Sequence, residues 1–275
     1  MARPFFIVSS GRSGTAMLQK ALSQGPDVEI HHEYMVHVVQ PLAVQRYMNW
    51  CSRDEAMAVL DRTHGAAVHY SEAAFWGDSS NKLSWLIPEL AALFPQAKFV
   101  HLVRDGRKVA GSYFHKLAAE CYDDRSTRIL SAYAASPSRL RPPPPEKKYW
   151  WPLPRPDDPW EDVFAGFDQF ARIAWHWAEI NRVIVASLAA LAPERSLFVR
   201  LEDLQASADE ATRLARFLGL APQEAHATLF ARPHNVNRPE DRLLDTSQSA
   251  AFERIAAPMM HRLGYADRPE YVVKY

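Results

Sequence analysis

The chain has 275 residues, 48% of them hydrophobic and 23% charged, which is ordinary for a globular protein with a substantial core. Its 32 basic and 32 acidic residues cancel, which argues against a general nucleic-acid or membrane-surface binder, because both need a basic excess. Two cysteines are too few for a disulfide framework, and no apolar run is long enough for a signal peptide or a membrane span, so we expect a cytoplasmic protein with free thiols.

The first expected elements are a strand, a loop and a helix. The apolar residues 5–8 predict a short buried strand, and the Gly/Ser-rich residues 9–15 predict a turn. Good helix formers follow over 16–24, and Gly25 and Pro26 end that helix.

A second strand–loop–helix unit is expected from a buried strand over 98–103 and a helix over 107–120. Two such units predict the α/β class, with a parallel sheet wrapped by helices. The other expected elements are, in chain order, a strand over 27–34, a helix over 41–62, a strand over 67–71, helices over 83–94 and 161–191, a strand over 196–201, and surface helices over 209–218, after Pro222 and over 247–263.

Residues 137–159 differ from the rest in composition. They contain the run Pro142–Pro145, four more prolines after it, and aromatic residues that include Trp150 and Trp151. Proline resists both helix and central strand, so this segment is expected to be irregular, and long ordered loops are often functional lids. A packed covering over the following helix is the alternative. We therefore predict one domain over residues 1–275, with a lid-like insertion at about 137–160.

The loop over residues 10–15 has the composition of a phosphate site. Between a strand and a helix, such a loop aims backbone N–H groups and a helix N-terminus at one point. Gly11 and Gly14 permit close approach of the backbone, and Arg12 adds a positive charge. The alternative is a plain strand-to-helix turn that binds no ligand and exposes its serine and arginine side chains to solvent. An ATP-binding P-loop requires a lysine directly after its last glycine. No lysine follows Gly14 in this chain, which counts against a nucleotide kinase.

This loop resembles the 5′-phosphosulfate loop of sulfotransferases, in the arginine variant typical of carbohydrate and tyrosylprotein sulfotransferases. The family usually has proline where this chain has Gly11, and often threonine where it has Ala16. The resemblance implies a P-loop-like three-layer α/β/α sandwich and a metal-free reaction with 3′-phosphoadenosine-5′-phosphosulfate (PAPS) as the sulfuryl donor. It also implies that PAPS is bound by Gly11, Arg12, Ser13, Gly14, Thr15 and Ala16.

The second motif begins at Arg104, directly after the strand over 98–103, and Ser112 lies eight residues further on. A charged group at the end of a buried strand needs a partner, which is either a carboxylate such as Asp105 or a phosphate. The pattern is similar to the 3′-phosphate site of sulfotransferases, which implies that Arg104 and Ser112 bind the 3′-phosphate of PAPS. The family's late basic loop implies a further contact from Arg238, although a solvated loop would have the same composition.

The acceptor side is expected at the end of the second strand, where His32 and Glu33 lie. Glu33 follows Arg12 by 21 positions, a spacing similar to that of tyrosylprotein sulfotransferases, which implies Glu33 as the general base and Arg12 as an aid to transfer. His32 is the competing base, because cytosolic sulfotransferases use a histidine. A Glu–His pair that merely caps the strand is the structural alternative.

Bacterial sulfotransferases often have a lysine, thought to stabilise the transferring group, at the position that Ser79 occupies in this chain. Lys82 is one candidate substitute, and Arg12 acting alone is the other. Residues 199–204 resemble a structural segment of the same family and mainly support the fold.

These features together predict a PAPS-dependent sulfotransferase that acts on a hydroxyl or an amine. A sugar, a peptide, a lipid head group and a small metabolite are all open as acceptors, and so is the oligomeric state. A kinase-like P-loop transferase and a non-catalytic nucleotide-binding relative are the alternative functions.

Overall fold

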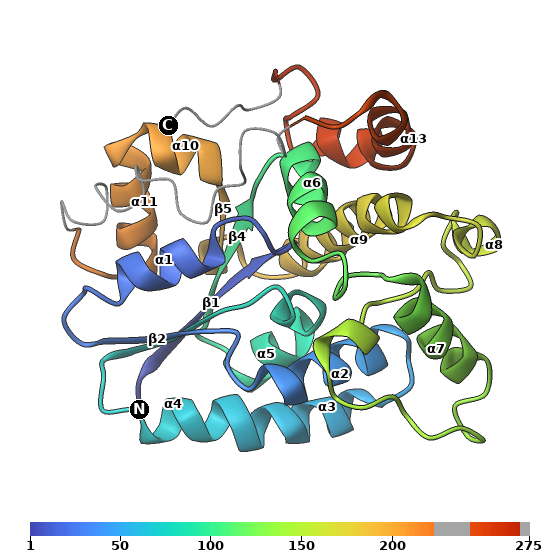
Figure 1. The fold of residues 1–275 in the computed structure, drawn as a ribbon. Coiled ribbons are helices and arrows are strands. Elements are labelled where there is room, and N and C mark those ends of the chain that lie inside the picture. The colour runs from blue at the N-terminus through green and yellow to red at the C-terminus, as the bar shows by residue number, and fades with distance from the viewer. Residues whose placement is uncertain (223–242, 270–275) are drawn as a thin grey trace.

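The computed structural model describes residues 1–222 and 243–269 and has a five-stranded parallel sheet at its centre, with the order β2-β3-β1-β4-β5 (Figure 1). The strands are β1 Arg3–Ser9, β2 Val28–His32, β3 Phe75–Ser79, β4 Lys98–Val103 and β5 Ser196–Arg200. Helices flank the sheet, which confirms the predicted α/β class.

The sheet is surrounded by helices of 4 to 21 residues. They are α1 Thr15–Leu22, α2 Val36–Tyr47, α3 Arg53–Leu60, α4 Ala66–Tyr70, α5 Ile87–Leu93, α6 Gly106–Lys116, α7 Asp124–Ala135, α8 Glu161–Phe164, α9 Gln169–Ala189, α10 Leu201–Ala206, α11 Ala208–Leu218 and α13 Thr246–Arg262. Within residues 1–222 and 243–269, no helix combines the length and the apolar character that a membrane crossing requires.

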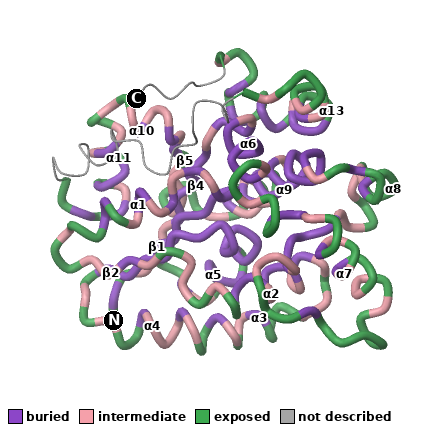
Figure 2. The backbone as a smooth tube through the Cα atoms, viewed as in Figure 1, coloured by how far each residue is buried: buried purple, intermediate pink, exposed green. Residues whose placement is uncertain are grey.

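The central strand β1 shows how the sheet is covered on both faces. Because side chains alternate along a strand, Phe6 and Val8 pack toward α2, α3, α5 and the second half of α9, whereas Phe5 and Ile7 pack toward α1 and α11. Burial on both faces is typical of parallel sheets and explains the unbroken apolar run of β1. Figure 2 shows the buried residues concentrated along the strands and α9, with the exposed ones on the outer helices.

The prediction of a strand over 67–71 is wrong, because these residues largely belong to α4. A short apolar run fits a helix as well as a strand, and this one continues the helical course of α3 through a π-helical turn, Asp61–Gly65. The strand in this part of the chain is instead β3, which follows α4. All five of its residues are buried, and its sequence does not alternate between polar and apolar residues. The side chain of Phe5 leaves room only for glycine at position 77 of β3, because a Cβ there would come 2.4 Å from the Phe5 ring.

Two predicted helices are interrupted. The helix expected over 41–62 is divided into α2 and α3, and Ser52 begins α3 with a capping box that includes Glu55. The helix expected over 161–191 is divided into α8 and α9, and the side chain of Asp168 caps α9. In both cases an N-capping side chain starts a new helix inside a stretch whose apolar pattern looks continuous.

The proline-rich segment is irregular, as expected, apart from one helical turn at Lys147–Tyr149. It is nevertheless packed against the protein, because Trp150 and Trp151 are only 2% and 6% exposed. Both belong to the apolar cluster that also contains residues of α6, α9 and α13.

Two buried histidines tie α9 to its surroundings. His101 on β4 contacts Asn181 of α9 through Nε2 and Oδ1 at 2.9 Å, the satisfied core histidine that the sequence led us to expect. His176 lies among the rings of Trp85, Tyr113 and Trp151. Burial lowers the pKa of His101 to about 4 and that of His176 to about 3.

Acidification should therefore destabilise the fold. An unfolded histidine has a pKa near 6.5, so below that pH the unfolded state binds more protons and the free energy of unfolding falls as pH is lowered. Each buried histidine should remove on the order of 2 kcal/mol between pH 7 and pH 5, measured by urea unfolding. His176→Phe should reduce this loss, and an unchanged pH dependence would show that His176 does not contribute to it.

Candidate functional site

The loop between β1 and α1 has a backbone that its sequence specifically permits. Gly11, Arg12 and Gly14 have φ angles of 79°, 52° and 92°, all in the left-handed region. A Cβ on Gly11 would lie 2.0 Å from Oη of Tyr113, so only glycine fits beneath that ring. Proline, which the family usually has here, is fixed near a φ of −65° and could not adopt this conformation.

The two motifs predicted from sequence meet at Arg12. Its Nε donates to Oγ of Ser112 on α6 at 2.9 Å, and Nη1 of Arg104 donates to the backbone oxygen of Arg12 at 3.0 Å. The expected alternative partner of Arg104, Asp105, instead binds Arg107 through both carboxylate oxygens, at 3.0 and 2.7 Å. Arg12 and Arg104 therefore lie in loops at the carboxyl ends of the adjacent strands β1 and β4 and contact each other there.

The hydroxyl groups of the loop make contacts within the protein. Oγ of Ser13 donates to the oxygen of Gly11 at 2.9 Å, and Oγ1 of Thr15 lies 3.1 Å from Nε2 of His32. Thr15 and Ala16 are the first two residues of α1, whose first-turn amides have no carbonyl partner within the helix. The loop thus offers backbone donors and positive charge, while its hydroxyl groups hold its shape.

Glu33 lies just after β2, with a φ of 56°, and its carboxylate is bracketed by two ammonium groups. Nζ of Lys82 lies 3.4 Å from Oε1, and Nζ of Lys147 contacts Oε2. Burial would raise the pKa of Glu33, but the two lysines outweigh it and lower that pKa to about 2. Burial also lowers the pKa of the neighbouring His32, against the attraction of Glu33.

Lys82 lies beside Glu33, whereas Ser79, at the position of the family's lysine, has a structural contact. Ser79 is fully buried, and its Oγ donates to the backbone oxygen of Thr15 at 3.0 Å, so it joins β3 to α1. Lys82, three residues later, is 6% exposed, bonds to Oδ1 of Asn81 at 2.8 Å and lies 5.1 Å from the centre of the Trp151 ring. Burial lowers its pKa, and Glu33 opposes that effect. An ammonium group is therefore present beside Glu33, supplied from a shifted position in the sequence.

Lys147 is the site residue that the sequence did not indicate. Nothing in the local pattern distinguishes it from Lys148, which pairs with Glu146 instead. Arg238, expected to contact the nucleotide, lies outside the described residues. Among residues 1–222 and 243–269, no group of three or more His, Cys, Asp or Glu side chains could hold a metal ion.

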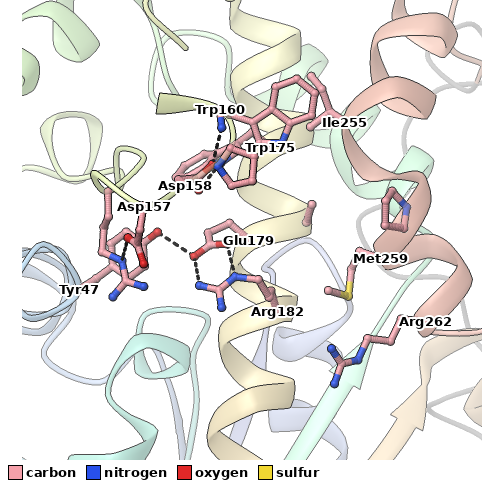
Figure 3. Close-up of a pocket in the computed structure, with 14 residues that line it drawn as sticks. Tyr47, Asp157, Asp158, Trp160, Trp175, Glu179, Arg182, Ile255, Met259 and Arg262 are labelled. Atoms are coloured by element: carbon pink, nitrogen blue, oxygen red, sulfur yellow. Dashed lines mark hydrogen bonds and ion pairs between the residues drawn. The ribbon is translucent and has the colours of Figure 1, made fainter. Parts of the chain in front are cut away.

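A separate cavity of about 580 Å³ lies between α9, α13 and residues 155–160 (Figure 3). Its wall contains a closed polar network, in which Oε1 of Glu179 accepts from Oη of Tyr47 at 2.7 Å and from Nη2 of Arg182 at 2.6 Å. None of the residues predicted to bind donor or acceptor lines this cavity.

Comparison with known proteins identifies the family that the two sequence motifs predict. A family model described as the sulfotransferase family matches residues 4–141, which is half of the chain. The chain therefore belongs to the sulfotransferase family. A search of curated proteins gave no match to it.

Solved structures show the same fold. The sulfotransferase domain from the curacin biosynthetic pathway is 14% identical, with a TM-score of 0.52 over 96% of this chain and 98% of that one. A sulfotransferase from Alicyclobacillus acidocaldarius is 17% identical, with a TM-score of 0.50 over 96% and 97%. A sulfotransferase from Mycobacterium avium is 12% identical, with a TM-score of 0.55 over 95% and 76%.

Gly11→Ala should destabilise the protein, because the new methyl group would collide with Tyr113 and the left-handed backbone would be strained. The expected loss is about 1–3 kcal/mol in the free energy of unfolding, measured in urea. Gly111→Ala is a matched control, because Gly111 lies within α6 and the added Cβ would be 3.6 Å from Cδ2 of Leu244, an ordinary van der Waals contact. The control should be neutral or slightly stabilising, and equal losses in the two variants would contradict this role of Gly11.

Proposed function

We propose that this sulfotransferase transfers a sulfuryl group from PAPS to a hydroxyl or an amine of its acceptor. The observation that supports this most strongly is the meeting of Arg12, Ser112 and Arg104 at the loop whose Thr15 contacts His32, the residue before Glu33. Two guanidinium groups and the N-terminus of α1 suit the phosphate groups of a nucleotide such as PAPS.

Donor binding is divided between the two motifs. Residues 11–16 hold the phosphosulfate through backbone donors and the charge of Arg12, while Arg104 and Ser112 hold the 3′-phosphate. Because Arg12 also contacts Ser112, one side chain lies next to both groups. Arg238 would add a further contact to the 3′-phosphate.

The transfer itself needs alignment, charge stabilisation and a proton acceptor. As the acceptor's oxygen or nitrogen bonds to sulfur, the bond from sulfur to the bridging phosphate oxygen breaks, and 3′-phosphoadenosine-5′-phosphate leaves. Glu33 takes the acceptor's proton. Lys82 stabilises the negative charge on the transferring group and thereby replaces the lysine that Ser79 displaces.

His32 is the weaker candidate for the base. Its Nε2 is engaged with Thr15 of the phosphate loop. This geometry suits a side chain that fixes the start of α1.

Arg104→Ala should weaken binding of 3′-phosphoadenosine-5′-phosphate by removing a charge-assisted contact. The expected loss is roughly 1.5–3 kcal/mol by calorimetric titration. Arg213→Ala, which removes an exposed partner of Glu210 on α11, is the control and should bind normally. ATP with Mg²⁺ is titrated in parallel, and preferential binding of ATP would replace the proposal with the kinase alternative.

Glu33→Gln should leave binding of the bisphosphate intact and lower turnover by ~10²–10⁴-fold, because the amide cannot accept the proton. Turnover is measured as bisphosphate formed from PAPS with a panel of phenols, sugars and amino alcohols, and with water alone. His32→Asn is measured beside it. If that variant loses the activity and Glu33→Gln keeps it, His32 is the base.

A further inference from the structure

The two cations beside Glu33 approach it from different sides. Lys82 is held within the protein, with a side chain only 8% exposed, and it faces Oε1. Lys147 belongs to the proline-rich segment, its side chain is 37% exposed, and it contacts Oε2. The oxygen of Glu33 that is closer to solvent is therefore the one that Lys147 covers.

The backbone that carries Lys147 is fastened in place. Gln40 of α2, which is 3% exposed, donates through Nε2 to the backbone oxygens of Lys147 at 3.0 Å and Trp150 at 2.7 Å. Nε1 of Trp150 in turn donates to the oxygen of Pro144 at 2.8 Å. Because the backbone is anchored and only the side chain reaches Glu33, Lys147 can leave by rotation of its own side chain.

This contact has a cost for the reaction. A general base needs some affinity for protons, and a carboxylate with a pKa of about 2 has very little. Replacement of the Lys147 ammonium group by a neutral hydroxyl would remove one positive charge from beside Glu33. Removal of a nearby positive charge raises the pKa of a carboxyl group, so the base gains strength when Lys147 leaves.

We propose that Lys147 is an acceptor-displaced plug: its ammonium group occupies the acceptor side of Glu33, and an acceptor reaches the base only by displacing it. The proposal rests on the role of Glu33 proposed above. It assigns Lys147 a part in acceptor selection, because each acceptor must compete with an ion pair built into the protein. Water, which is small and abundant but cannot replace the pair, is thereby kept from the base and PAPS is protected from hydrolysis.

The test measures release of sulfate from PAPS with water as the only acceptor. Lys147→Met should raise the rate by up to roughly tenfold, because removal of the adjacent positive charge strengthens the base and uncovers it. Lys147→Arg keeps the charge and should stay near the parent rate. Lys148→Met is the matched control and should not change it, because Lys148 pairs with Glu146 and not with Glu33.

Two further measurements separate the plug from the proposed base. Calorimetry with 3′-phosphoadenosine-5′-phosphate should give equal affinities for the parent protein and Lys147→Met, which places the effect on the acceptor side. In the double variant Lys147→Met/Glu33→Gln, the added hydrolysis should be lost. An unchanged or lower rate in Lys147→Met overturns the plug. A raised rate that persists in the double variant instead overturns Glu33 as the base.

Discussion

The contacts that hold Arg12 connect the two halves of the site. Its guanidinium group is fixed by Ser112 and its carbonyl oxygen by Arg104, so both ends of this residue depend on the β4–α6 unit. Since β1 and β4 are neighbours whose following chain segments lead to opposite sides of the sheet, their carboxyl ends border the crevice where ligands bind in open α/β sheets. The left-handed loop, the glycine beneath Tyr113 and the anchoring of α1 by Ser79 all serve to keep the loop in that crevice.

The second organising constraint is the pairing of Glu33 with two lysines. Lys82 would be costly to bury alone, and it lies beside the half-buried Glu33, with Lys147 completing the group from the solvent side. The three residues come from the end of β2, the loop after β3 and the proline-rich segment. The two lysines that stabilise the Glu33 carboxylate in the folded protein also lower its affinity for protons, and so they make it a weak base.

Much of the fold, and the position of the two motifs at the ends of β1 and β4, could be predicted from sequence because both depend on local patterns. The strands β1 and β4 are continuous apolar runs, and the residues that follow them match known loops. The strand β3 was not predicted, because Phe75–Ser79 is buried on both faces and includes polar residues whose partners are found only in the folded protein. The sequence offers Lys82 as a candidate substitute for the family's lysine, but it does not indicate that Lys82 or Lys147 contacts Glu33. These residues are 49 and 114 positions from Glu33, and no local spacing records such a contact.

The family match ends at residue 141, whereas the segment that carries Lys147 runs over 137–160. The matched region therefore contains Arg12, Glu33 and Arg104 but not Lys147. On the proposed roles, the donor site and the base lie in the matched region, whereas the side chain that an acceptor displaces lies in the proline-rich segment. A change in that segment would then alter the choice of acceptor while every residue of the donor loop stayed the same.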